Sequence, residues 1–405
     1  MTAESPLKAD DSRGQRWREV GTALGLSGGA AVALGLSRFS YGLLLPPMRA
    51  DLGWTYVEAG AMNTANGAGY VVGALIAAWL AYRWGMARTF LAGFSVSVVI
   101  LLVTATTTDV AALIALRTVG GASTALTFIL GAGLASAICP ARNPRRRGTL
   151  VGLYVAGVGI GILVSGVGIP IVLSSGVQQW PEGWIVLGVL GAVCLPAAWW
   201  AARSVPEPAG SRIALLRGRE FRRIAPTFVG YGLFGAGYVG YMTFIIALLQ
   251  EQGRSSGQVI WFWSVLGLVS AVATLLWGKV LGVVRESRGP SMVFAITMLG
   301  TLPVLVFPAS PAAMFVSAVL FGGSFLAGPT AITIVAQRQL PVSSWTAAIA
   351  LLTVSFAFGQ AVSPLLAGAI SDATGNISAG FWVSPALLAA AAAVNLLQRP
   401  AAGKF

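Results

Sequence analysis

Residues 184–223 decide the fold, and they read WIVLGVLGAVCLPAAWWAARSVPEPAGSRIALLRGREFRR. The first part, residues 184–202, carries no charged side chain and is long enough to cross the hydrocarbon core of a bilayer as a helix. The second part, residues 203–223, is the longest non-apolar stretch of the chain and contains six arginines. The pattern predicts a transmembrane helix that ends in a basic loop, near the middle of the 405-residue chain.

The composition of the whole chain indicates the same class. Hydrophobic residues make up 56% of it and charged residues 10%, with a mean hydropathy of +0.79. A soluble domain is about a quarter charged, so this chain could not cover a surface that faces water. There is no histidine, and Cys139 and Cys194 form no spaced pair, which argues against imidazole metal sites, histidine-dependent catalysis and disulfides. We predict an all-α integral membrane protein that is not an enzyme and needs no metal or cofactor.

Apolar runs of about 20 residues recur along the chain, and each predicts one membrane-spanning helix. The twelve expected spans are residues 20–46, 56–82, 89–106, 110–139, 149–173, 184–202, 225–249, 258–284, 291–307, 311–337, 345–371 and 379–398. The basic loop, residues 203–224, divides them into two six-helix halves, residues 20–202 and 225–398. Short tails remain at residues 1–19 and 399–405.

The net charge of +13 follows the pattern of membrane topology. An even number of spans puts both termini on one side, and the basic residues gather in the tails and loops of that side. Only Arg49 and Arg254 fall on the other side, while Arg38 and Arg117 lie inside spans. The positive-inside rule therefore predicts cytoplasmic termini. We expect a multi-pass protein of the bacterial cytoplasmic membrane, with lipids around it and no nucleic-acid partner.

Two six-helix halves, a basic central loop and cytoplasmic termini resemble the major facilitator superfamily (MFS). After the second span, residues 78–88 are similar to the superfamily's loop motif G-x-L-A-D-R-x-G-R-R. Arg83, Gly85 and Arg88 keep positions of that motif, whereas Tyr82 stands at the aspartate position. The resemblance implies a transporter that works by alternating access, with these three matching residues at a cytoplasmic gate. The substituted aspartate puts the usual charge relay there in doubt.

A closer resemblance, to the poorly characterised YbfB/YjiJ-type branch, covers the first two spans. The matching residues are Arg38-Phe39-Ser40-Tyr41, Leu45-Pro46, Met48, Ala59-Gly60, Asn66, Gly69-Tyr70 and Gly73-Ala74. In the fourth span, Arg117 and Gly121 resemble the superfamily's R-x-x-x-G motif. The superfamily resemblance implies substrate binding near the membrane midplane, between the two halves.

Arg38 and Arg117 are the only charged residues placed deep in a predicted span. At about 1.5 Å per residue, Arg38 lies roughly 12 Å and Arg117 roughly 10 Å from the outer ends of their spans. A charge at such depth costs about 2.5–3.5 kcal/mol and suggests a function. No aspartate or glutamate lies as deep. Two arginines without a carboxylate favour an anionic substrate. The alternative for either is a structural role, bonded to backbone carbonyls.

Polar and aromatic residues at similar depth complete the expected substrate site. Besides the two arginines they are Tyr41, Asn63, Asn66, Tyr70, Tyr238, Tyr241 and Gln360. Such side chains inside a membrane usually face the bundle interior. Residues 261–263, Trp-Phe-Trp, are instead expected in an aromatic belt at the membrane surface.

The sequence thus predicts a secondary transporter for a small organic anion or acidic metabolite. Two alternatives stay open: export of amphipathic drugs or metabolites and, more remotely, a non-transporting membrane sensor. Glu58 fits a capping box with Thr55 better than a proton site. Coupling would then use counter-anion exchange or a proton carried with the substrate. We expect a monomer.

Overall fold

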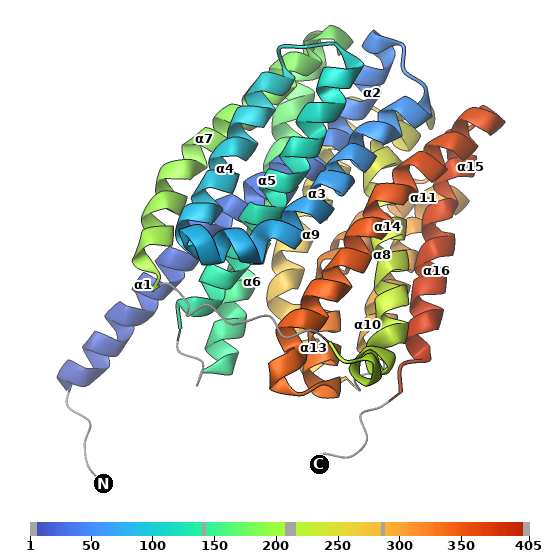
Figure 1. Ribbon diagram of the computed structural model, residues 1–405. Coiled ribbons are helices and arrows are strands. Elements are labelled where there is room, and N and C mark those ends of the chain that lie inside the picture. The colour runs from blue at the N-terminus through green and yellow to red at the C-terminus, as the bar shows by residue number, and fades with distance from the viewer. Residues whose placement is uncertain (1–5, 140–142, 207–215, 285–287, 400–405) are drawn as a thin grey trace.

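The computed structural model describes residues 6–139, 143–206, 216–284 and 288–399. Parts of both predicted tails (1–5 and 400–405) and the middle of the predicted central loop (207–215) lie outside the described residues. The described chain is a helical bundle without strands (Figure 1). The start of the first helix and the end of the last lie at the same end of the bundle, here called the termini end (Figure 1). The opposite end is called the far end.

The first half runs from Pro6 to Ser204. Its elements are α1 (Pro6–Ala30), the π-helix η1 (Ala31–Phe39), α2 (Tyr41–Leu52), α3 (Tyr56–Trp84), α4 (Met86–Thr104), α5 (Val110–Ala137), α6 (Pro144–Val172), the short 3-10 turns η2 (Leu173–Ser175) and η3 (Val177–Gln179), and α7 (Trp180–Ser204).

The second half runs from Gly218 to Leu396. Its elements are α8 (Gly218–Glu251), α9 (Ser256–Val283), α10 (Gly289–Thr301), α11 (Pro303–Val306), α12 (Pro311–Gly322), η4 (Phe325–Ala327), α13 (Gly328–Gln339), η5 (Val342–Ser344), α14 (Trp345–Thr374), α15 (Ile377–Phe381) and α16 (Val383–Leu396).

These elements make twelve spans long and apolar enough to cross a membrane, which confirms the predicted number. The first span differs most from expectation, because it covers Gly14–Leu52 and does not stop at Pro46. Membrane helices tolerate proline, so Pro46 lies inside α2. The helix ends where Gly53 adopts φ +67°, a conformation that favours glycine.

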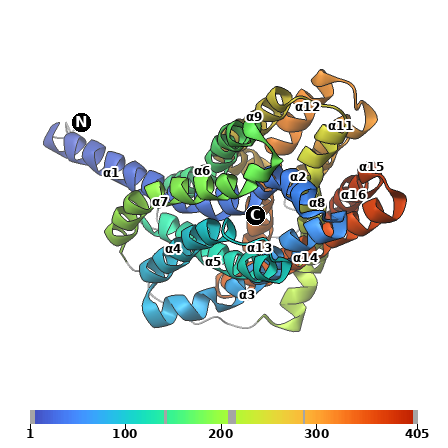
Figure 2. The same cartoon turned by 90° about the horizontal axis from the view of Figure 1, so that it is seen from above.

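The two halves meet mainly through α3 against α14 and α6 against α9 (Figure 2). Glycines allow this close approach. A Cβ atom on Gly60 would lie 2.5 Å from the carbonyl oxygen of Pro364, and one on Gly159 would lie 2.4 Å from the backbone nitrogen of Ala271. Both distances are far shorter than a van der Waals contact, so larger residues here would force the halves apart.

At the far end a carboxylate joins the halves. Asp372 of α14 accepts hydrogen bonds from the backbone N–H groups of Tyr56 (2.9 Å) and Val57 (2.8 Å), which begin α3. It thereby caps a helix of the other half. The Arg49 guanidinium carbon lies 3.8 Å from the centre of the Tyr56 ring. Asp372 therefore fastens the two halves together at the far end.

One expectation about aromatic residues is wrong. Trp261 is 43% exposed, but Phe262 and Trp263 are fully buried and so do not form a surface belt. The Trp263 ring packs on Gly166 of α6, and its indole N–H donates to Ser165 at 3.4 Å. Trp263 therefore serves the contact between the halves, because α9 presents it to α6 instead of to lipid.

Candidate functional site

A π-helix sets the position of Arg38. η1 covers Ala31–Phe39, and all of its residues are buried. It closes at Ser40, whose N–H and hydroxyl both donate to the carbonyl oxygen of Gly35, at 3.1 and 2.7 Å. Gly35 itself lies so close to α6 that a Cβ there would be 2.7 Å from the Cα of Gly161. π-helical segments inside α-helices often occur at functional sites.

Arg38 is a buried cation without matching acceptors. Its side chain is 2% exposed, and its Nε and Nη2 have no hydrogen-bond partner among the residues that the structure describes. The guanidinium carbon lies 5.3 Å from the centre of the Tyr70 ring, and the ring of Phe39, the next residue, meets the Tyr238 ring of the second half edge-on at 6.3 Å. A cation–π contact contributes about 0.5–2 kcal/mol, less than the cost of burying the charge. A bound anion would supply both the hydrogen-bond acceptors and the counter-charge that Arg38 lacks.

Arg117, on α5, has the partners that Arg38 lacks. Its side chain is 4% exposed, and three of its nitrogens donate hydrogen bonds. The acceptors are the carbonyl oxygen of Ser37 (2.9 Å), Oδ1 of Asn63 (3.3 Å) and the carbonyl oxygen of Met62 (3.4 Å). Its guanidinium also faces the ring of Tyr41 at 4.8 Å. These contacts join η1, α3 and α5, and they favour the structural alternative for Arg117.

The neighbouring glycine explains the R-x-x-x-G spacing physically. Gly121 lies one turn after Arg117, and a Cβ there would be 1.9 Å from the carbonyl oxygen of Asn66 on α3. The amide nitrogen of Asn66 in turn donates to the carbonyl oxygen of Arg117 at 3.3 Å. The glycine brings α5 close enough to α3 for the arginine to reach the backbone acceptor on Met62.

The two asparagines occupy different surroundings. Asn63 donates across the halves to the hydroxyl of Thr243 at 2.6 Å and accepts from Arg117, so both ends of its amide are bonded. Asn66 is fully buried, and its Oδ1 has no partner within the described part of the chain. A free acceptor of this kind could receive a proton donor from a ligand.

The predicted tyrosines separate into two pairs. Tyr41 donates to the carbonyl oxygen of Ala59 at 2.7 Å, and Tyr241 shares a 2.6 Å hydrogen bond with Ser317. Each of these hydroxyls bonds inside its own half. Tyr70, in contrast, faces the guanidinium of Arg38, and Tyr238 of the second half packs edge-on against Phe39, the next residue. The second pair therefore lies around Arg38.

The second half contributes an aromatic wall beside Arg38. We use this name for Tyr231, Phe234, Tyr238, Phe294, Phe325 and Phe356. Tyr238 stacks on Phe356 at 5.5 Å and approaches Phe39 edge-on at 6.3 Å. The hydroxyl of Tyr238 accepts a hydrogen bond from Gln360, whose own Oε1 is buried and has no partner among the described residues.

Sequence reasoning missed most of this wall. Phe39, which contacts Tyr238 and Phe325 of the wall, follows Arg38 directly, and this position was a usable signal. Phe325 and Phe356, however, lie in apolar runs that resemble any other span. Only the packing of η4 and α14 against α8 brings them to Tyr238.

The predicted gate residues lie away from this site, at the turn between α3 and α4. Arg83 and Arg88 are exposed. Gly85 adopts φ +88° and caps α3 through its N–H, which donates to the carbonyl oxygen of Ala81 at 2.9 Å. The motif therefore has glycine at this position because the positive φ angle disfavours other residues. Tyr82, at the aspartate position, is 83% exposed.

The assembled candidate site consists of Arg38, Tyr70, Tyr238 and Gln360, with Asn66 nearby on α3. Within the described residues, no cluster of three histidine, cysteine, aspartate or glutamate side chains could hold a metal. The arrangement offers a cation, hydrogen-bonding groups and aromatic rings between two helical halves. Because Arg38 is 2% exposed, the site is closed to solvent in this structure.

Known proteins share both the sequence and the architecture. A chloramphenicol resistance protein of Streptomyces lividans is 26% identical over 381 residues, which covers 89% of this chain and 92% of that protein. A mutant of the nucleoside transporter NupG superposes with a TM-score of 0.67 at 14% identity, covering 93% of this chain and 98% of that one. A bacterial homologue of the human lysosomal transporter Spinster, inward-facing and unoccupied, gives 0.66 at 15% identity, with 95% of each chain covered.

The two solved structures show that the fold is shared with these transporters. A family model described as the uncharacterised MFS-type transporter YbfB matches residues 30–396. That range includes Arg38, the π-helix segment around it, the second half and all of the first half after α1. The resemblance read from the first two spans is thereby confirmed. The chain is a multi-pass membrane protein with the fold of transporters that move small molecules. It belongs to the YbfB-type family of MFS transporters.

Proposed function

We propose that the protein carries a small organic anion with an aromatic or apolar body. The observation that carries this proposal is the unsatisfied guanidinium of Arg38, buried between the two halves. A carboxylate would accept hydrogen bonds from Nε and Nη2 together, in the bidentate geometry that suits arginine. Charge neutralisation and hydrogen bonding would then both act on the same ligand group.

The aromatic wall supports the apolar body of this ligand. Tyr238 and Phe39 lie edge-to-face across the line between the halves. Aromatic rings favour aromatic partners by about 0.5–1.5 kcal/mol beyond the area they bury. A ring attached to a carboxylate would thus contact both kinds of group in the site.

A second candidate is export of neutral amphipathic compounds. The observations in its favour are the extent of the aromatic wall and the likeness to a chloramphenicol resistance protein. In this version Arg38 would hold helix geometry and the rings would bind the cargo. The two candidates differ in one respect only, which is whether the ligand needs a negative charge.

For the orientation, the proposal places the termini end in the cytoplasm of a bacterial cell, in accord with the distribution of basic residues. We propose alternating access by a monomer, with counter-anion exchange or a proton carried by the acidic substrate. Arg83, Gly85 and Arg88 would belong to the cytoplasmic gate.

Thermal unfolding of the purified protein tests the proposal with matched ligand pairs. Benzoate and 1-naphthoate are compared with benzamide and 1-naphthamide, and chloramphenicol is added as a neutral amphipath. A ligand at about 100 times its dissociation constant stabilises by about 2.7 kcal/mol, which is readily measured. We expect the carboxylates to raise the melting temperature of the wild type more than the matched amides do, and this difference to disappear in Arg38→Gln.

Arg203→Gln is the matched control. Arg203 is exposed and lies 3.8 Å from the Trp199 ring, so its loss removes a cation–π contact outside the candidate site. This variant should respond to 1-naphthoate like the wild type. If the amides and chloramphenicol stabilise wild type and Arg38→Gln alike, and the carboxylates do not, the anion proposal is wrong and export of neutral compounds replaces it.

A further inference from the structure

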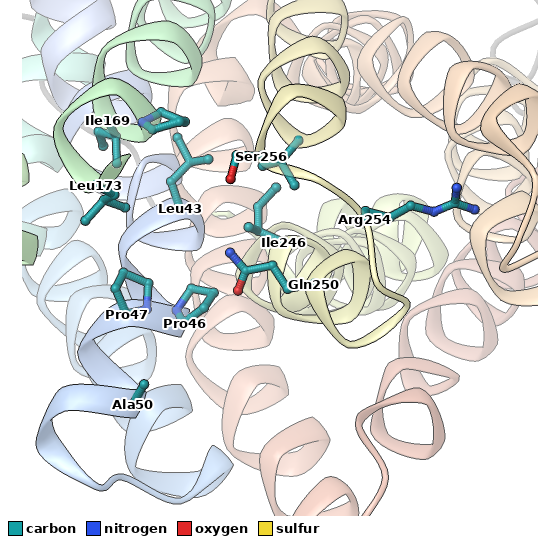
Figure 3. Close-up of a pocket in the computed structure, with 12 residues that line it drawn as sticks. Leu43, Pro46, Pro47, Ala50, Ile169, Leu173, Ile246, Gln250, Arg254 and Ser256 are labelled. Atoms are coloured by element: carbon teal, nitrogen blue, oxygen red, sulfur yellow. The ribbon is translucent and has the colours of Figure 1, made fainter. Parts of the chain in front are cut away.

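A cavity of about 290 Å³ lies at the far end, between α2 and α6 of the first half and α8 and α9 of the second (Figure 3). Its floor is buried and apolar, with Leu43, Ile169 and Ile246. Ala50 and Gln250, which line its rim, are exposed. The cavity therefore opens at the far end and narrows toward the interior of the bundle.

The cavity continues the line of the candidate site. Leu43 follows Arg38 by five residues, and Ile246 follows Tyr238 by eight. At about 1.5 Å per residue, the floor begins roughly 7 Å beyond Arg38 along the first span and roughly 12 Å beyond Tyr238 along α8. The first span, which carries Arg38, and α8, which carries Tyr238, thus also line the cavity.

A thin layer separates the two places. Between them, a Cβ on Gly42 would lie 2.6 Å from the carbonyl oxygen of Met242, so the backbones of α2 and α8 touch at this level. The side chain of Met242 is 2% exposed. Because this layer is a contact between the halves, a rocking movement of one half against the other would open it.

The lining is suited to an uncharged, flat group. Pro46 and Pro47 present rings on one side, and Gln250 directs its amide toward them (Figure 3). Arg254 is the one charged residue among the described lining residues, and its guanidinium points away from the others, toward the carbonyl oxygen of Pro308. The volume is near the lower end of the range for small-molecule pockets.

We propose that this cavity is a second binding position for the transported substrate, beyond the Gly42–Met242 layer, where the aromatic or apolar part of the substrate binds against the prolines and Gln250. The inference rests on the proposed function, because it assumes the same amphipathic anion. It adds that the substrate passes through two positions of different chemistry: a charged one at Arg38 and an uncharged one at the far end.

Cysteine labelling tests this position in the full-length protein. In a background in which Cys139 and Cys194 are replaced by alanine, Leu43→Cys is treated with a membrane-impermeant thiosulfonate from the far side. We expect 1-naphthoate and 1-naphthamide both to slow the reaction. At about ten times the dissociation constant, the rate should fall about tenfold, because only the free protein reacts. Thr108→Cys, exposed on another loop of the far end, should react at an unchanged rate.

Two further variants keep the test decisive. Ala50→Cys, on the exposed rim, gives the same readout if Leu43→Cys does not fold. Gln250→Ala should weaken protection at either cysteine. Slow labelling that neither probe changes would indicate a resident lipid chain and would overturn the inference, as would rapid labelling without protection.

The Arg38→Gln background separates this inference from the proposed function. The cavity lies beyond the layer, so 1-naphthamide should still protect Leu43→Cys when Arg38 is replaced. If 1-naphthoate stabilises the wild type through Arg38 but protects neither cysteine, the second position is wrong and the anion site stands. If protection occurs but carboxylates give no stabilisation that depends on Arg38, the cavity binds ligand and the anion proposal is wrong.

Discussion

Arg38 and Arg117 are both arginines buried inside the helical bundle, yet their surroundings differ. Their side chains are 2% and 4% exposed, and each guanidinium faces a tyrosine ring. Arg117 donates three hydrogen bonds, to Ser37, Met62 and Asn63. Arg38 keeps two nitrogens without an acceptor among the described residues. Burial of a charge therefore does not by itself indicate a ligand site, whereas the balance of donors and acceptors does.

The energetic consequences of losing either residue should also differ. Removal of Arg117 would leave buried acceptors unsatisfied, and each costs about 1–3 kcal/mol. Removal of Arg38 would leave no acceptor unpaired and would relieve the cost of burying a charge. A residue kept at such a cost to stability is expected to serve function.

The largest effect is expected for Arg117→Ala. Because three acceptors lose their donor at once, we expect a loss of stability of about 3–5 kcal/mol and little folded protein. Arg117→Lys should be intermediate, since one ammonium cannot reach the three acceptors in the same geometry. Thermal unfolding in detergent measures both variants. An Arg117→Ala protein as stable as the wild type would remove the distinction between the two arginines.

A smaller effect is expected for Gly121→Ala, which tests how α5 is placed. The added methyl group would lie 1.9 Å from the carbonyl oxygen of Asn66 and would push α5 from α3, at a cost of about 1–3 kcal/mol. The adjacent Gly120→Ala is the control. Its nearest neighbour would be a methyl group of Ile100 at 3.2 Å, which needs to shift by only a few tenths of an ångström, so any loss of stability should be much smaller than for Gly121→Ala. Equal melting temperatures for the two variants would contradict the role of Gly121.

The smallest change in stability is expected for Asp372→Ala, which tests the fastening at the far end. Loss of a helix cap costs about 1 kcal/mol. Asp109→Ala also removes a helix cap, in which Asp109 accepts from the N–H of Ala112 at 2.7 Å, but this cap lies within one half. Both should lower the melting temperature similarly. Only Asp372→Ala should speed the labelling of Met242→Cys from the far side, and equal labelling rates would show that Asp372 does not hold the halves together.

Much of the fold could be predicted from the sequence because the membrane sets a length for apolar runs. The positions of Arg38 and Arg117 within their spans followed from the same run lengths. The partners of Arg117 did not, because backbone carbonyls such as that of Ser37 are offered by every residue. The π-helix at Ala31–Phe39 was also hidden, since no residue type marks it. The aromatic wall depends on contacts such as Tyr238 with Phe325, which are set by long-range packing.

The most direct test of the account compares Arg38→Gln and Arg117→Gln by thermal unfolding, each with and without 1-naphthoate or 1-naphthamide. Without ligand, Arg38→Gln should melt at or above the wild-type temperature and Arg117→Gln well below it. 1-Naphthoate should stabilise the wild type and Arg117→Gln more than 1-naphthamide does, whereas it should stabilise Arg38→Gln no more than the amide does. If Arg38→Gln is as destabilised as Arg117→Gln and still gains more from 1-naphthoate than from the amide, Arg38 is a structural residue and the central claim is wrong.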